Sequence, residues 1–436
     1  MGRNRLPWPT KTPYYGWILM VVLGITTIIS YGTTQYLFGV LVVPISTTFQ
    51  WDRASISGAY TLGLIVAGVI GVPIGPLLDR SGARLLMSCG SALAGLALIG
   101  LSQMHTLWQF YVLWSGGLGL AMALTLYPVT FTIVANWFVR KRGTALAVLT
   151  LIGGLSSPIC IPLSGVLIAQ IGWRTTLVVL GCSQLLLALP LHFFVLKRHP
   201  EDLGLSPDGE PTPEVKTSQS LTGFSLSMAL HSPTFWMLTT SLSLVMLGST
   251  VVFVHQVAYL IGRGYNPVLV ATLSGMLGLV SLPGRYVFNT LSTRVSAQML
   301  LGLSIVTQAI GMAVLVLAPS LPWLILYVII YGTAYGAFSP LRASVMADHF
   351  GRRAYGSITA VQGVPGALCA GLGPLVAGWI YDTSHHYELA FWLCAGAFLL
   401  GALGIFVTSQ PRNEHESTTV EKVELVQEVV GSKMEG

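Results

Sequence analysis

Residues 75–84 read Gly-Pro-Leu-Leu-Asp-Arg-Ser-Gly-Ala-Arg, and this short charged stretch lies between two long apolar segments. Asp, Glu, Lys and Arg make up only 9% of the 436 residues, whereas 53% are hydrophobic. The mean hydropathy is +0.72. Charged groups are costly inside a bilayer, so a loop of this kind belongs at a membrane surface. The stretch therefore indicates a membrane-embedded chain and marks one turn of its fold.

Apolar runs long enough to cross a bilayer recur along the whole chain. A run of roughly 18 or more apolar residues with few charges is typical of a transmembrane helix. The sequence predicts an all-α membrane protein with twelve such helices, near 15–40, 54–78, 84–104, 107–135, 143–170, 174–196, 233–260, 268–291, 297–318, 322–347, 355–380 and 388–408.

A polar stretch in the middle divides these helices into two groups of six. It contains His199-Pro-Glu-Asp-Leu-Gly and Pro207-Asp-Gly-Glu-Pro-Thr-Pro, whose Pro, Gly and acid content is typical of a linker. We predict an N-terminal six-helix bundle at 1–196, a cytoplasmic linker at 197–230, a C-terminal six-helix bundle at 231–410 and a cytoplasmic tail at 411–436.

The positive charges predict the orientation in the membrane. With the N-terminus in the cytoplasm, 17 of the 22 lysines and arginines fall in cytoplasmic segments. Cytoplasmic loops carry such an excess. We therefore expect a multi-pass protein of the cell (inner) membrane with both termini cytoplasmic, in contact with membrane lipids.

The two halves also share a pattern. Pro128 and Pro340 are 212 residues apart, and the same offset relates Arg140 to Arg352. A worn copy of the 75–84 stretch surrounds Arg294. Duplicated six-helix units are typical of transporters, whose substrate site lies at the repeat interface near the midplane. The sequence therefore predicts two pseudo-symmetric bundles with a site between them.

Motifs for catalysis, metals and nucleotides are missing. The five cysteines lie inside apolar segments without metal-type spacing, and no GxxxxGK[ST], HExxH or dinucleotide-binding turn occurs. We expect no enzyme activity, no catalytic residues, no cofactor, no metal and no nucleic-acid partner.

The chain resembles the major facilitator superfamily over roughly residues 13–410. The loop Gly75-x-x-x-Asp79-Arg80-x-Gly82-x-Arg84 looks like the signature of that superfamily. Three stretches look more narrowly like its monocarboxylate and oxalate–formate porter branch: Tyr15-Gly16-Trp17 with Ser30-Tyr31-Gly32 and Phe49 to Ser57, Trp137-Phe138-Val-Arg140-Lys-Arg142-Gly143, and His255-Gln-Val-Ala-Tyr259 to Tyr265.

The resemblance implies alternating access, in which the two halves rock around a central cavity. Within the signature loop we assign a gating role to Gly75, Asp79, Arg80, Gly82 and Arg84. A carboxylate at Asp79 can face the positive N-terminus of a neighbouring helix, expected to be the eleventh. Glycine at 75 lets two helices approach closely. The alternative is a loop that serves only as a topology signal.

Arg285 is the candidate substrate anchor. It lies inside the eighth predicted helix, where an arginine costs about 2.5–3.5 kcal/mol on insertion scales and normally faces a cavity. Its planar fork binds a carboxylate through two parallel hydrogen bonds. In the carboxylate-porter branch an arginine here contacts the substrate carboxylate. The alternative is that the side chain snorkels to the cytoplasmic surface, as we expect for Arg342.

Three positions depart from the branch pattern. Ser281 stands where proton-coupled monocarboxylate porters usually have an acid, and Gln35 stands where they have a lysine. Gln362 stands where the oxalate exchanger type has a second cation. A single deep cation favours one carboxylate over two, and it puts the usual proton relay in doubt.

Further polar residues are candidate substrate contacts on the expected cavity helices: Tyr31, Gln35, Tyr127, Tyr259, Tyr331, Tyr335 and Gln362. His255 is a candidate proton carrier because histidine titrates near neutral pH. For each of these residues a packing role is the alternative.

These observations predict a secondary active transporter of a small organic anion, a monocarboxylate, by alternating access. Coupling by exchange and coupling to protons both stay open. The alternatives are an exporter of larger amphipathic compounds and a non-transporting membrane sensor on the same fold. We expect a monomer.

Overall fold

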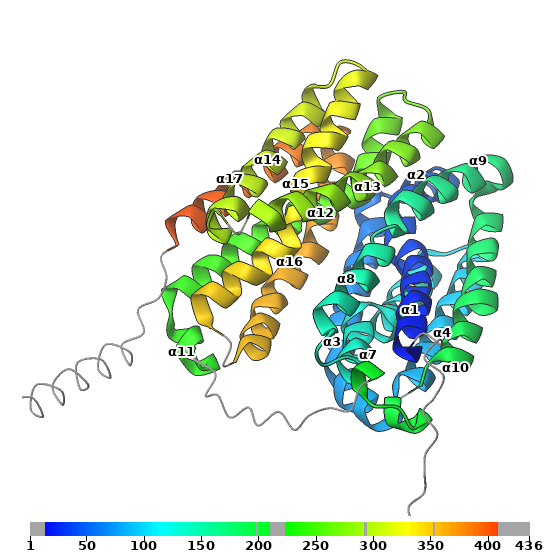
Figure 1. Cartoon of the computed structure of the whole chain (residues 1–436). Helices are drawn as coiled ribbons and strands as arrows, with labels where there is room; N and C mark the ends of the chain where they lie inside the picture. Colours follow the sequence, from blue (N-terminus) through cyan, green and yellow to red (C-terminus); the bar gives the residue numbers. More distant parts are fainter. Residues whose placement is uncertain (1–13, 198, 210–222, 292–293, 352–353, 409–436) are drawn as a thin grey trace, which may run out of the picture.

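The computed structural model of the chain describes residues 14–197, 199–209, 223–291, 294–351 and 354–408. Within these ranges every regular element is a helix, apart from one isolated antiparallel bridge between Gly223 and Gly351. The helices form two bundles, coloured blue to green and green to red in Figure 1. The predicted all-α membrane fold is confirmed.

Eleven helical stretches of the described residues are long and apolar enough to cross a membrane. The longest, Arg142–Val195, has 54 residues. At about 1.5 Å per residue it is more than twice as long as a bilayer core is thick. Its chain turns back at Gly172, where the backbone leaves the helical conformation, so this stretch makes two crossings. The described chain therefore makes twelve crossings.

The first bundle holds α1 (Tyr15–Tyr31), α2 (Leu37–Phe49), α3 (Arg53–Ser81), α4 (Ala83–Ser102), α5 (Leu107–Phe110), α6 (Gly119–Thr125), α7 (Tyr127–Trp137), α8 (Arg142–Gly153), α9 (Ser156–Ser183) and α10 (Leu189–Val195). Three π-helical segments interrupt its crossings: Gly32–Tyr36, Tyr111–Leu118 and Gln184–Ala188. The sequence predicted unbroken helices at these places.

The second bundle holds α12 (Pro233–Gly262), α13 (Pro267–Leu291), α14 (Ala297–Leu317), α15 (Leu321–Phe350), α16 (Tyr355–Ser384) and α17 (Glu388–Val407). Before it come two short 3₁₀ turns, Pro200–Leu203 and Pro207–Gly209, and helix α11 (Leu226–His231). The boundaries of the four predicted segments stay predictions, and the predicted tail lies outside the described residues.

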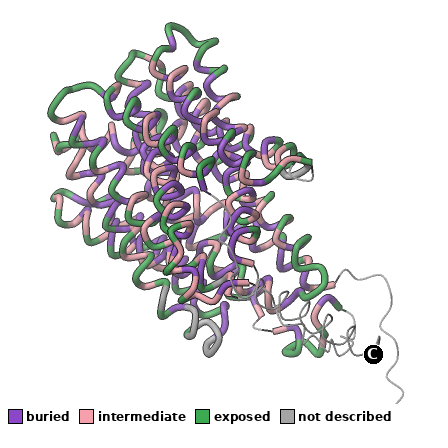
Figure 2. Tube along the Cα trace, turned by 90° about the vertical axis from the view of Figure 1, so that its left-hand side faces the viewer, coloured by how far each residue is buried: buried purple, intermediate pink, exposed green. Residues whose placement is uncertain are grey.

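Exposed residues follow the outer faces of the helices, as the green parts of the tube in Figure 2 show. Many of them are large and apolar: Leu186 is 72% exposed, Val69 66% and Leu400 62%. Apolar exposure on this scale suits a surface that faces lipid chains rather than water.

Both ends of the described chain and the linker segment lie at one end of the molecule, here named the terminal end (Figure 1). We name the opposite one the far end. The connections at the far end are short, and none between consecutive helices exceeds four residues: 50–52, 103–106, 172, 263–266, 318–320 and 385–387.

Two glycines make nearly identical tight turns in the first bundle. Gly82 has φ 75° and ψ 158°, and Gly172 has φ 77° and ψ 159°. Only glycine adopts this conformation readily, which explains its place in the 75–84 stretch. An arginine follows each turn: Arg84 stacks 4.3 Å from the ring of Phe193, and Arg174 donates hydrogen bonds to backbone carbonyls at the end of α4. The repeated turn fits three-helix inverted repeats within a half.

The first part of the linker is bound to the first bundle through Asp208. Its carboxylate accepts hydrogen bonds from the backbone N–H groups of Val139, Arg140 and Lys141, at 2.7–3.1 Å. Burial acts to raise the pKa of Asp208, but these three bonds outweigh it and hold that pKa below its usual value. The loop after α7 is thereby fixed to the linker.

The last part of the linker contacts the second bundle at the corresponding place. The backbone N–H of Phe224 donates to the carbonyl of Phe350, at 2.9 Å. Phe350 ends α15 and lies 212 residues after Phe138, which follows α7. The described linker segments therefore contact equivalent corners of the two halves.

Two glycines hold α13 and α15 in backbone contact. A methyl group at Gly284 would collide with the carbonyl oxygen of Thr333, and one at Gly336 would collide with the carbonyl oxygen of Ser281. Small residues permit this close approach, which stabilises helix pairs in lipid. The contact fixes Arg285, next to one of these glycines, relative to the helix that carries the other.

We expect Gly336→Ala to lower the free energy of unfolding by about 1–3 kcal/mol, because the added methyl forces α13 and α15 apart. The check is the Tm of the purified protein in detergent. Gly396→Ala in α17 is the matched control, since a Cβ there meets no atom within 4 Å. Equal Tm values for the two variants would contradict the prediction.

Candidate functional site

A cavity of about 250 Å³ lies between the two bundles. The first bundle contributes Tyr31, Gln35, Tyr36, Tyr127, Gly153, Gly154 and Ser157 to its lining. The second contributes Met246, Gly278, Ser281, Arg285, Tyr335, Phe338, Ser339 and Arg342. Residues of both halves therefore line a single space, which we name the central cavity.

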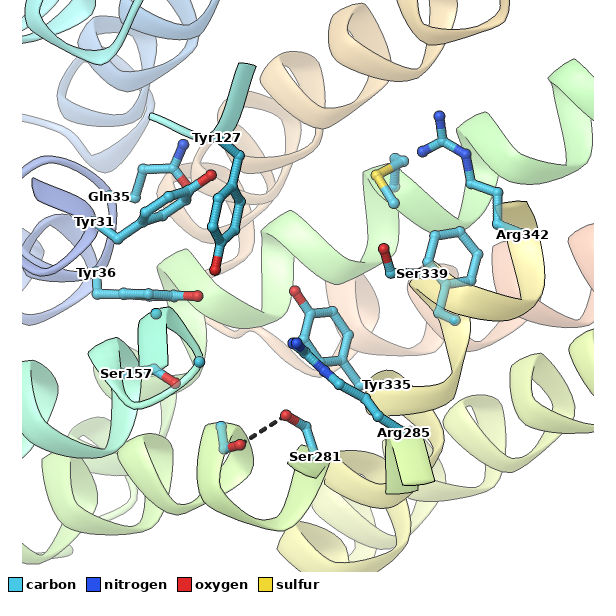
Figure 3. A pocket seen from close by; sticks show the side chains of 15 residues that line it. Tyr31, Gln35, Tyr36, Tyr127, Ser157, Ser281, Arg285, Tyr335, Ser339 and Arg342 are labelled. Carbon is cyan, nitrogen blue, oxygen red and sulfur yellow. Dashed lines mark hydrogen bonds between the residues drawn. The ribbon is translucent and has the colours of Figure 1, made fainter. Parts of the chain in front are cut away.

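Together with Arg342, Arg285 is one of the two charged residues that line this cavity. The side chain is half-buried, and its Nε is buried without a hydrogen-bond partner in the described part of the chain. In Figure 3 its guanidinium points into the same space as the hydroxyl groups of Tyr36, Tyr127 and Tyr335. A buried guanidinium N–H without a partner costs free energy, and a bound anion would satisfy it.

In the first bundle, segments of irregular backbone hold the tyrosines and the Gln35 amide that line the cavity. Gln35 and Tyr36 lie on the π-helical segment Gly32–Tyr36, a form frequent at functional sites. Thr33 in this segment donates to the carbonyl of Ile29, at 2.8 Å, and accepts from the side-chain amide of Gln184, at 2.7 Å. The wider turn is therefore held by side-chain hydrogen bonds.

Tyr127 reaches the cavity through a break in its crossing. Leu126 is extended, with φ −86° and ψ −176°, and separates α6 from α7. Pro128 lies directly inside α7 and has no N–H to continue the helix across this point. The ring of Tyr127 lies 4.9 Å from that of Tyr31, so the break brings two candidate contacts together.

The structure brings five of the nine predicted contacts together and leaves four elsewhere. Arg285, Gln35, Tyr31, Tyr127 and Tyr335 line the central cavity. Tyr331 is fully buried beside Tyr327 and Phe398, and Gln362 is buried in α16. Tyr259 packs against Phe391 and accepts a hydrogen bond from Arg263 at the far end.

His255 lies between the halves near the far end, not in the central cavity. Its Nε2 lies 2.8 Å from the carbonyl of Pro374 and 3.3 Å from the hydroxyl of Ser57. Its Nδ1 lies 3.0 Å from the hydroxyl of Tyr387, which accepts from Arg53. A neutral ring with the proton on Nε2 satisfies every one of these contacts, a tautomer that we assign from geometry. This environment favours a structural role over proton transfer.

The same region joins the N-terminus of α3 to α16. The carboxylate of Asp382 accepts from the backbone N–H groups of Arg53 and Ala54, at 3.0 and 2.7 Å. The carboxylate of Asp52 accepts a hydrogen bond from the backbone N–H of Ser55, three residues later in the chain. Side chains from both halves therefore cap the N-terminus of α3. An anion is favoured at a helix N-terminus, so this contact holds the far end closed.

The sequence missed several cavity residues. Tyr36 and Ser157 gave no signal because their orientation depends on local helix geometry. Arg342 was expected to snorkel to the surface, but the structure places it in the cavity lining, beyond Ser339 in Figure 3. Its position inside a predicted helix was the signal that could have identified it.

The predicted gate is described only in part. The side chains of Asp79 and Arg80 and the surroundings of Gly75 lie outside what the structure describes, as does Thr293 in the worn copy of the loop. Gly82 makes the tight turn and Arg84 stacks on Phe193, so both act in the packing of the first bundle.

Comparison with known proteins places the fold among transporters. The major facilitator superfamily model matches residues 23–368 and 286–433. Monocarboxylate transporter 13 of Rattus norvegicus is 29% identical over 413 residues, covering 92% of this chain and 90% of that protein. The protein of the same name from Bos taurus is 28% identical over 435 residues, covering 97% and 96%.

Solved structures with a similar fold are also transporters. A bacterial homologue of the human lysosomal transporter Spinster, in an inward-facing and occupied conformation, gives a TM-score of 0.72 at 16% identity, covering 91% of this chain and 97% of that one. A point mutant of the nucleoside transporter NupG gives 0.72 at 12% identity, covering 89% and 99%.

Asp382→Asn is expected to shift the equilibrium toward a state open at the far end by about tenfold, because it weakens two charge-assisted hydrogen bonds. The readout is the distance distribution between spin labels at Thr47 and His386, which are both exposed at the far end. Asp52→Ala removes a cap within one half and should leave the distribution unchanged. A distribution that also stays unchanged in Asp382→Asn would refute the closing role.

Proposed function

Because this chain belongs to the major facilitator superfamily, we propose that it is a secondary transporter that carries a small monocarboxylate between its two bundles by alternating access. Arg285 in the central cavity is the observation on which this proposal rests. The names of the relatives in Rattus norvegicus and Bos taurus support the same class of substrate.

The chemistry of the cavity suits one carboxylate. The guanidinium of Arg285 offers two parallel N–H donors, which match the two oxygens of a carboxylate. The hydroxyls of Tyr36, Tyr127 and Tyr335 point into the same space and are further donors (Figure 3). A bound carboxylate would satisfy the free guanidinium and orient the rest of the substrate toward the first bundle.

Arg342 is the second cation in the lining, and it competes for the role of anchor. In Figure 3 it lies beyond Ser339, apart from Arg285 and the tyrosine hydroxyls. We assign it a weaker, long-range attraction for anions that enter the cavity. A test of the anchor therefore has to compare the two arginines.

Alternating access needs a closed far end in one state and a closed terminal end in the other. The contact of Asp382 with α3 supports closure of the far end in this structure. We propose that the 75–84 stretch, with Asp79 near the end of α3, closes the terminal end in the opposite state. The terminal end faces the cytoplasm in this proposal.

Coupling by exchange agrees best with the cavity. Among its lining residues in the described part of the chain there is no Asp, Glu or His. A proton that travels with the substrate needs a group that titrates near the working pH, as in general acid–base chemistry. His255 is away from the cavity and has hydrogen-bond partners on both nitrogens.

Arg285→Gln should reduce uptake of labelled butyrate, pyruvate or benzoate into proteoliposomes at least about thirtyfold, because the bound carboxylate loses its charged partner. Arg342→Gln is the matched control, with an expected loss below about threefold since that residue acts only at long range. Thermal melts confirm that both variants fold. The reverse order would make Arg342 the anchor, and binding without uptake by the intact protein would indicate a sensor.

Exchange coupling has its own test. Proteoliposomes preloaded with unlabelled butyrate should take up labelled butyrate at least about fivefold faster than empty ones, since each transport cycle returns with a substrate. An imposed proton gradient without preloading should give no more uptake than protein-free liposomes. Acceleration by the proton gradient alone would contradict exchange.

A further inference from the structure

We propose that the substrate is a monocarboxylate with an apolar tail of several carbons, and that the tail binds in a second chamber in the first bundle. This inference rests on the proposed function, because Arg285 holds the head group. It names the substrate class more narrowly than a small organic anion.

The second chamber lies next to the central cavity. It has a volume of about 330 Å³, and Tyr31 and Gln35 line both spaces. A molecule bound at Arg285 therefore reaches the chamber past these two side chains. The charged group is in the second bundle and the chamber is in the first, so one substrate contacts both halves.

The walls of the chamber are almost wholly apolar. Ala67, Gly68 and Gly71 come from α3, and Met122, Ala123 and Val129 come from α6 and α7. None of the residues in its lining is charged, and Thr132 is the polar one besides the shared Tyr31 and Gln35. A second carboxylate or an ammonium group would lose its hydration there without a partner.

Two glycines keep the chamber hollow. Gly68 and Gly71 are both exposed, and a Cβ added at either meets no atom within 4 Å, so neither glycine serves a close helix contact. Glycine in a helix costs about 1 kcal/mol relative to alanine. The space in front of both glycines, at the break between α6 and α7, is unfilled and leaves room for the tail of a ligand.

The volume and chemistry together set the kind of tail. A two- or three-carbon acid bound at Arg285 leaves the chamber empty. Each methylene group of a longer acid that leaves water for the chamber gains about 0.8 kcal/mol, roughly a fourfold gain in affinity. Affinity should therefore rise with chain length until the chamber is full.

The test is a binding series of straight-chain saturated monocarboxylates with three to eight carbons, on the full-length protein in lipid nanodiscs. Empty nanodiscs are subtracted because longer acids partition into lipid. We expect Kd to fall about fourfold per added carbon over several steps in the wild type. Gly68→Leu fills the chamber and should abolish this gain while binding of the three-carbon acid stays within about twofold.

Gly363→Leu in α16 is the matched control. A Cβ there also meets no atom within 4 Å, but the residue does not line the chamber, so the gain with chain length should persist. A flat wild-type series, or a gain that survives in Gly68→Leu, overturns the tail inference. If Arg285→Gln still abolishes binding in that case, the proposed function stands. If no acid binds at all, or Arg285→Gln binds as the wild type does, the proposed function fails as well.

Discussion

Helices in a bilayer gain little by hiding apolar surface from one another, because lipid is equally apolar, so they associate through close packing. Glycine makes this packing possible here, within and between the halves. A Cβ at Gly39 would lie 2.5 Å from the carbonyl oxygen of Phe253, and one at Gly378 would lie 2.8 Å from that of Arg53. Smooth backbone contacts of this kind, unlike interlocked side chains, can separate and re-form in the alternating access that we propose.

The two halves contribute different kinds of side chain to the central cavity. The second bundle supplies the guanidinium groups of Arg285 and Arg342, whereas the first supplies tyrosines, an amide and irregular helix geometry. In the proposed function, a charge on one wall and hydrogen-bond donors on the other let a single anion contact both bundles. The glycine contact of α13 with α15 fixes the charged wall, and the π-helical segment fixes the other.

The sequence predicted the fold well because the hydropathy of successive residues shows which segments cross the bilayer. It also predicted that Arg285 faces a cavity, because a charge inside an apolar run has few explanations. It could not predict Tyr36, because a π-helical turn rotates side chains without changing the apolar pattern. It also missed the break at Leu126, because one extended residue between two apolar helices leaves that pattern unchanged. The Asp382 contact joins residues about 330 positions apart, so no local signal reveals it.

The short connections at the far end have a consequence beyond packing. With no connection between consecutive helices longer than four residues on that side, the protein presents only short loops there to another macromolecule. An antibody, a protease or a soluble partner protein would bind at the terminal end instead. In the proposed function, the far side is therefore reached only by solutes small enough to pass between the bundles.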